Sequence, residues 1–164
     1  MFSKAMQDAI NEQIKNELYS AYLYLAMSAY SEANGMPGIA QWLRVQSQEE
    51  VSHAMKFFGF VNERGGRVVL HAIDQPPIDF ESPVQIFEAT LEHERKVTAM
   101  IHRLYEIALQ EKDYPAQVML HWFIDEQVEE ESTAGQILDT LKMIGDKGYA
   151  LVALDRELGK RGGD

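Results

Sequence analysis

Apolar side chains recur every three to four residues over four long stretches of the chain, which is the spacing of amphipathic α-helices. Turn-forming residues close three of these stretches at Gly35, Gly65 and Gly145, and helix-capping residues start two of them at Ser82 and Asp113. A shorter apolar segment follows the fourth stretch. The pattern therefore predicts four long helices and a short fifth helix, over residues 3–34, 36–64, 83–112, 114–144 and 147–159.

A long segment, residues 65–81, separates the second predicted helix from the third. A helix of about 29 residues is roughly 44 Å long, and this segment can span roughly 56 Å when extended. It can therefore run the length of the bundle and place the second and third helices parallel. The expected fold is all-α, a ferritin-like four-helix bundle of two antiparallel hairpins and one long crossover. The C-terminal segment is too short to join the core end to end and is expected to form a short helix that docks on another surface. One domain is expected to cover residues 1–164.

The apolar stripe of the first predicted helix illustrates how polar residues enter the expected core. It comprises Ile10, Ile14, Ala21, Leu25 and Ser28, with Glu17 and Tyr24 among them. A carboxylate on such a stripe points inward. The other long helices show the same feature, because each carries a glutamate on its apolar face.

These inward polar residues form a repeated pattern. A carboxylate and an imidazole three residues apart lie on one face of a helix and can reach one point beside it. The pattern Glu17…Glu50-x-x-His53 occurs again 77 residues later as Glu94…Gln127-x-x-Glu130. Two structurally related hairpins that face each other would produce this repeat.

Four glutamates in one buried layer carry four negative charges, and burying unpaired carboxylates costs several kcal/mol each. The inner stripes offer no Lys or Arg, so a salt-bridged core is the weaker alternative. Two divalent cations would balance the charge, and oxygen ligands with one imidazole suit iron(II), manganese or zinc. We assign Glu17, Glu50 and His53 to one metal. We assign the bridging Glu50 with Glu94 and Glu130 to the other.

Several further residues have two open interpretations. Gln127 is neutral and is either a weak ligand or a hydrogen-bond partner of one. Tyr24 either supports the metal site, by a hydrogen bond or an electron, or is a core tyrosine. Glu49, Glu126 and Glu129 either bind a further cation or form a solvated acidic face. The remaining histidines are expected at the surface, at His71, His93, His102 and His121.

Composition narrows the class of protein. A net charge of −11 argues against nucleic acid and favours cations. The chain has no cysteine, which excludes disulfides and thiolate metal sites and fits a reducing compartment. The longest uncharged run, residues 18–31, is shorter than the roughly 18 apolar residues that a membrane span needs. No signal-peptide pattern is found at the start. We therefore expect a cytoplasmic protein without a membrane segment.

These residues, in this order, resemble the non-haem ferritins of bacteria and archaea over nearly the whole chain. The resemblance implies iron storage, in which Fe(II) is oxidised by dioxygen or peroxide at a dinuclear centre and kept as a ferric mineral. It also implies a homo-oligomeric shell of 24 subunits, and a third iron site at Glu49, Glu126 and Glu129.

Two departures separate the chain from bacterioferritin. That relative carries a second Glu-x-x-His where this chain has Gln127-x-x-Glu130, and a haem-binding Met where Ser52 stands. No haem is therefore expected. The alternative function is a di-iron oxidase or peroxidase of the same superfamily that does not store iron, because it would use the same ligands.

Overall fold

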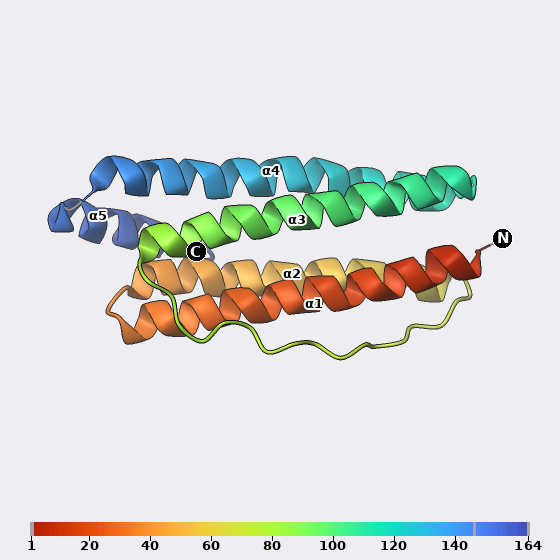
Figure 1. Ribbon diagram of the computed structural model, residues 1–164, viewed down its shortest axis with the longest axis horizontal. Helices are drawn as coiled ribbons and strands as arrows, with labels where there is room; N and C mark the ends of the chain where they lie inside the picture. Colours follow the sequence, from red (N-terminus) through yellow and green to blue (C-terminus); the bar gives the residue numbers. More distant parts are fainter. Residues whose placement is uncertain (1, 146, 164) are drawn as a thin grey trace.

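The computed structural model describes residues 2–145 and 147–163. Its helices pack as two antiparallel hairpins, α1 with α2 and α3 with α4, and the crossover from α2 to α3 runs along the bundle (Figure 1). This arrangement confirms the predicted fold. In chain order the helices are α1 (Lys4–Ala33), α2 (Pro37–Glu63), α3 (Pro83–Gln110), α4 (Tyr114–Ile144) and α5 (Gly148–Leu158).

Local signals set where the helices begin and end. The side chains of Ser3, Ser82 and Asp113 each accept a hydrogen bond from a backbone N–H of the first turn, at 3.1 Å in all three cases. Asp113 also forms an ion pair with Arg64 at 2.8 Å, so the start of α4 is tied to the end of α2. The α1–α2 turn contains Gly35 at φ +74°, a conformation that side chains disfavour.

Two apolar clusters fill the bundle on either side of its middle. One contains Phe57 and Phe123, whose rings stack at 4.0 Å between centroids. The other contains Trp42 and Phe87, at 5.3 Å between centroids. The inward glutamates lie between these clusters, so their surroundings are apolar at both ends. These apolar surroundings lower the local dielectric constant and strengthen electrostatic interactions in the middle layer.

The inner stripe of α1 differs from the predicted one at Leu25, which is 47% exposed. Tyr24 is buried as predicted, and Leu23 and Met27, which the predicted stripe did not include, are buried as well. Two successive steps of four residues, from Glu17 to Ala21 to Leu25, advance about 80° beyond two full turns, and this drift carries Leu25 off the inner face. It lies on the outside of α1.

The short helix α5 docks on α2. The Asp155 carboxylate accepts hydrogen bonds from the backbone N–H groups of Gly38 (3.1 Å) and Ile39 (2.8 Å) at the start of α2. A negative charge is favourable there because these amides have no partner in the helix. A Cβ on Gly38 would lie 1.6 Å from the Asp155 carbonyl oxygen, so the contact requires glycine. No helix in the described ranges is long and apolar enough to cross a membrane.

Candidate metal centre

The first hairpin brings three potential ligands together. Glu17 comes from α1, and Glu50 and His53 come from consecutive turns of α2. One ligand atom from each lies within 4.8 Å of the other two. All three side chains are buried, with exposed fractions of 1%, 2% and 5%. His53 Nδ1 lies 3.1 Å from a Glu50 carboxylate oxygen. These positions match the group that the sequence assigns to the first metal.

The second hairpin contributes Glu94 from α3, with Gln127 and Glu130 from α4, and all three are buried. Gln127 donates from Nε2 to the Glu94 carboxylate at 3.1 Å and to the Glu94 carbonyl oxygen at 3.2 Å. The Tyr24 hydroxyl donates to the other Glu94 carboxylate oxygen. The amide and the phenol therefore orient Glu94, which fits the supporting roles considered for Gln127 and Tyr24.

Gln46 joins the two hairpins and was not identified as a site residue from the sequence. Its Nε2 donates to Glu50 at 3.2 Å and to Glu130 at 2.8 Å. It stands one turn before Glu50 on the inner stripe of α2. A glutamine on the mostly apolar inner stripe, four residues before Glu50, is the sequence feature from which its role could have been predicted. Its Oε1 is buried and has no hydrogen-bond partner among the described residues.

The electrostatics of the middle layer favour protons or cations. No Lys or Arg of the described chain pairs with Glu17, Glu50, Glu94 or Glu130. Burial, with the charge of Glu50, raises the pKa of Glu17 well above its usual range. Burial, followed by the charges of Glu94 and Glu130, does the same to the pKa of Glu50.

Glu94 and Glu130 show the same trend. Burial raises the pKa of Glu94. Burial, with the charge of Glu94, raises the pKa of Glu130 to about 7. One oxygen of the Glu17 carboxylate is buried and has no hydrogen-bond donor within residues 2–145 and 147–163. A carboxylate oxygen of this kind is suited to a metal ion, because a cation supplies the neutralising charge that no side chain provides.

Tyr24 is fully buried, and burial together with the Glu94 charge raises its pKa well above the usual range. It therefore stays a protonated donor. His93 packs edge-on against its ring at 5.8 Å, and the Ser20 hydroxyl lies 2.7 Å from His93 Nε2.

The expectation of a surface His93 is therefore met only in part. The side chain is half-buried on α3 facing α1, where burial lowers its pKa to about 4 and leaves the ring neutral. The other three histidines, at His71, His102 and His121, are exposed as expected.

One pocket of about 530 Å³ lies between α2 and α4, and three glutamates outside the buried layer line it: Glu49, Glu126 and Glu129. Their surroundings differ. Glu126 joins His53 and Glu130 in a second group whose ligand atoms lie within 4.8 Å of one another. Glu129 is exposed. The Glu49 carboxylate instead forms an ion pair with Arg161, at 2.7 Å. The structure therefore brings one of the three, Glu126, to the buried centre.

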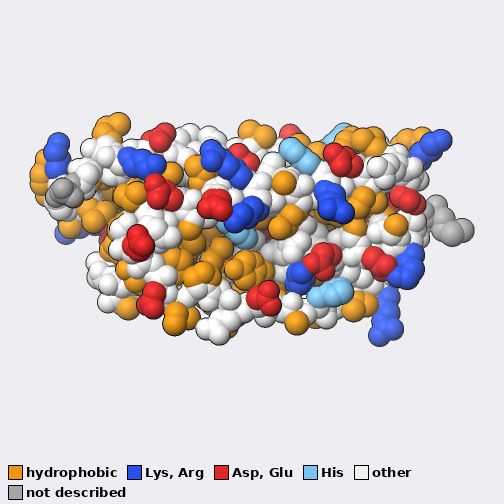
Figure 2. Space-filling model, viewed as in Figure 1, with side chains coloured by type: hydrophobic (Ala, Val, Ile, Leu, Met, Phe, Trp, Pro, Cys, Tyr) orange, Lys and Arg blue, Asp and Glu red, His pale blue; other side chains and the backbone are white. Residues whose placement is uncertain are grey.

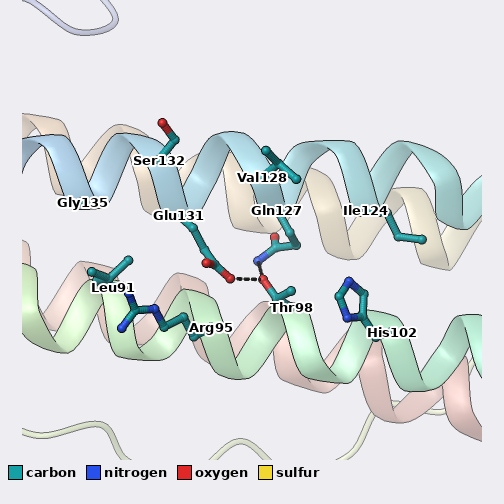
Figure 3. Close-up of a pocket in the computed structure, with 10 residues that line it drawn as sticks. All are labelled: Leu91, Arg95, Thr98, His102, Ile124, Gln127, Val128, Glu131, Ser132 and Gly135. Carbon is teal, nitrogen blue, oxygen red and sulfur yellow. Dashed lines mark hydrogen bonds between the residues drawn. The ribbon is translucent and has the colours of Figure 1, made fainter.

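A groove of about 450 Å³ between α3 and α4 reaches the centre from the other side (Figure 3). The Thr98 hydroxyl lies 2.7 Å from the Glu131 carboxylate and accepts a hydrogen bond from Gln127 Nε2 at 3.3 Å. Gln127 in turn donates to Glu94. A chain of polar groups therefore connects this groove with the buried carboxylates.

A four-helix bundle with one long crossover, and with acidic side chains from all four helices buried at its middle, defines the ferritin-like class of helical proteins. The chain belongs to the ferritin family, since the family model described as a Ferritin-like domain matches residues 7–144. The resemblance inferred from the sequence is confirmed.

Individual relatives agree with this assignment. A bacterial non-heme ferritin of Bacteroides fragilis (strain 638R) is 44% identical over 98% of this chain and 100% of its own length. One from Staphylococcus aureus (strain USA300) is 39% identical over 98% and 97%. Among solved structures, an open pore ferritin from the hyperthermophilic archaeon Archaeoglobus fulgidus is 50% identical with a TM-score of 0.97, over 98% of this chain and 99% of the other.

Proposed function

We propose that the protein stores iron and oxidises Fe(II) at a dinuclear centre. The observation that carries this proposal is a buried layer of four glutamates to which the described chain supplies no Lys or Arg partner. Glu17, Glu50 and His53 would hold one iron, and Glu50, Glu94 and Glu130 the other. Family membership supports iron as the metal, because ferritins are iron-storage proteins.

The chemistry follows from the ligand set. Two Fe(II) ions supply four positive charges against four carboxylates, and binding them displaces the protons that the raised pKa values favour. Their oxidation releases two electrons. With two protons, these reduce one dioxygen to hydrogen peroxide, or one hydrogen peroxide to two waters. Gln127 and Tyr24 would hold Glu94 in position during this step.

A third iron would bind beside this pair, at Glu49, Glu126 and Glu129, on the way to the stored mineral. The pocket that these residues line touches the centre through His53 and Glu130. Glu130 belongs both to the proposed second metal and to the group with Glu126. It could therefore pass an oxidised ion from one position to the other.

Storage requires a shell, which we propose to be a homo-oligomer of 24 chains. One surface suits self-association, because exposed apolar side chains gather on the C-terminal half of α1 and the crossover beside it (Figure 2). Their exposed fractions are 50% for Tyr22, 47% for Leu25 and 71% for Ile78. An apolar patch of this kind marks an interaction site on a folded protein. We place the shell in the cytoplasm.

The alternative, a di-iron oxidase or peroxidase without storage, would share the centre but not the shell. Aerobic Fe(II) loading, with absorbance of the ferric product and particle mass followed together, separates the two. Storage predicts a particle of several hundred kilodaltons that retains many more irons than its ligand sites can hold. A dimer that turns over Fe(II) without retaining it would contradict storage. A protein that binds no iron would contradict both proposals.

A further inference from the structure

Glu49 stands beside the proposed bridging ligand Glu50, yet it does not join the other acidic groups. Its carboxylate lies 2.7 Å from a guanidinium nitrogen of Arg161, which comes from the C-terminal tail after α5. Glu126, by contrast, lies 3.7 Å from His53. The two sides of the pocket between α2 and α4 therefore differ. The side at Glu126 can accept a cation, whereas the side at Glu49 already holds the Arg161 guanidinium.

Arg161 is held on α2 by contacts other than this ion pair. Its guanidinium lies 4.3 Å from the Trp42 ring centroid, and Nη1 donates to the Trp42 carbonyl oxygen at 3.4 Å. The Arg161 carbonyl oxygen accepts from Gln41 Nε2 at 3.4 Å. The side chain is 23% exposed. Stacking on an aromatic ring and a fixed backbone pre-organise the guanidinium.

A second cation lines the same pocket without this connection. Lys56 lies over the Trp122 ring at 3.9 Å from its centroid. Among residues 2–145 and 147–163, no ion pair links Lys56 to a carboxylate. The pocket therefore has two positive charges, and one of them holds Glu49.

We propose that Arg161 is a tethered competitor of the third iron, so that a metal ion gains Glu49 only when the guanidinium leaves. The inference rests on the proposed function, since the third iron is the one placed there. Arg161 acts through Glu49 and does not touch the dinuclear ligands, which makes it a positioning residue. It weakens the third position selectively and leaves binding of the first two ions unchanged.

The test is an anaerobic Fe(II) titration of the assembled protein by calorimetry. Arg161→Gln should bind the third ion about three- to tenfold more tightly, as expected when a partly exposed ion pair and a nearby like charge are removed. The affinity for the first two ions should not change. Lys56→Gln, the matched control, removes one positive charge from the same pocket and should change third-ion affinity no more than about twofold, because it releases no carboxylate.

A double-mutant cycle shows whether the effect passes through Glu49. The gain from Arg161→Gln should disappear in a Glu49→Gln background, whereas a loosened tail or a general charge effect would persist there. Equal gains in Arg161→Gln and Lys56→Gln, or no gain in Arg161→Gln when two ions still bind, would overturn the inference. Fewer than two ions bound by the unmodified chain would instead overturn the proposed function.

Discussion

Single buried glutamates carry the chemistry proposed for this molecule. Each one is buried without a Lys or Arg partner among the described residues, and burial raises its pKa. The structure satisfies several of the carboxylate oxygens by amides and a phenol, from Gln46, Gln127 and Tyr24. Neutral donors orient a carboxylate without neutralising it. That combination leaves the layer able to exchange protons for metal ions.

Replacing the proposed bridge, Glu50, tests whether the two metal positions work as a unit. Glu50→Ala should slow the oxidation of the first two Fe(II) ions by more than about 100-fold, because both irons lose a ligand. Glu17→Ala and Glu94→Ala should each have a smaller effect. Glu63→Ala, an exposed glutamate on the same helix, is the control. Stopped-flow absorbance measures the rates, and near wild-type kinetics in Glu50→Ala would rule out the dinuclear assignment.

The pKa of Glu130 predicts how the metal-free protein responds to pH. Its value rises from 4.5 to about 7 on folding, so the folded chain binds more protons than the unfolded chain between those pH values. Stability must then fall as the pH rises through this window, by up to about 3 kcal/mol for this one group.

Glu130→Gln removes that ionisation and should stabilise the metal-free protein at pH 8 but not at pH 4. Thermal unfolding with a chelator present gives the comparison. Glu129→Gln, an exposed neighbour, should change neither value. The interpretation fails if wild type and Glu130→Gln lose stability equally between the two pH values.

The third position predicts a change in ion count. Anaerobic Fe(II) titration should show three bound ions per chain, falling to two in Glu49→Ala/Glu126→Ala. Oxidation of the first two ions should persist. The rate of repeated Fe(II) oxidation should change, because the route from the dinuclear centre to the stored mineral is altered. Glu88→Ala/Glu92→Ala removes two exposed carboxylates elsewhere and serves as the control. Three ions and unchanged turnover in the first variant would leave these glutamates as a solvated face.

The positions of the proposed ligands followed from helix periodicity, because residues three or four apart share a face wherever the helix lies. The structure indeed buries Glu17, Glu50, His53, Glu94 and Glu130. Contacts between distant segments could not be predicted this way. The pairing of Arg161 with Glu49 joins residues 112 positions apart, and the partial burial of His93 depends on how α1 packs on α3. Neither leaves a periodic signal.

At the scale of elements, the helices and the crossover were predictable because their signals are local. Glycines end α1 and α2, side-chain oxygens cap α3 and α4, and the crossover length decides that α2 and α3 run in the same direction. The docking of α5 was predicted only in outline. Its contact with the start of α2 depends on one carboxylate, Asp155, and on the space at Gly38.

Asp155→Ala should therefore loosen α5. Losing two hydrogen bonds to the first turn of α2, and the favourable charge there, should cost about 1 kcal/mol. Hydrogen exchange of the α5 amides should rise, and so should that of the Gly38 and Ile39 amides. Asp139→Ala, an exposed aspartate of α4, is the matched control. Unchanged exchange in Asp155→Ala would mean that other contacts dock the helix.

At the scale of the whole molecule, two features stand out in a chain of net charge −11. Four glutamates are buried without a Lys or Arg partner among the described residues, and an apolar surface is exposed on α1 and the crossover. Under the proposed function, metal ions would satisfy the first feature, and other copies of the chain would satisfy the second. Oxidation and storage would thus depend on different parts of one bundle. A centre that lies between two apolar clusters, reached by a polar groove on one side and an acidic pocket on the other, suits a site through which ions pass.

The central claim is that two Fe(II) ions are oxidised together in each chain. The most direct test mixes the metal-free protein, equilibrated anaerobically with increasing Fe(II), with oxygenated buffer and records the amplitude of the fast absorbance phase. We expect the amplitude to rise linearly and to reach a plateau at two Fe(II) per chain. A plateau at one Fe(II) per chain, or a rise that continues through three without a break, would contradict the dinuclear centre.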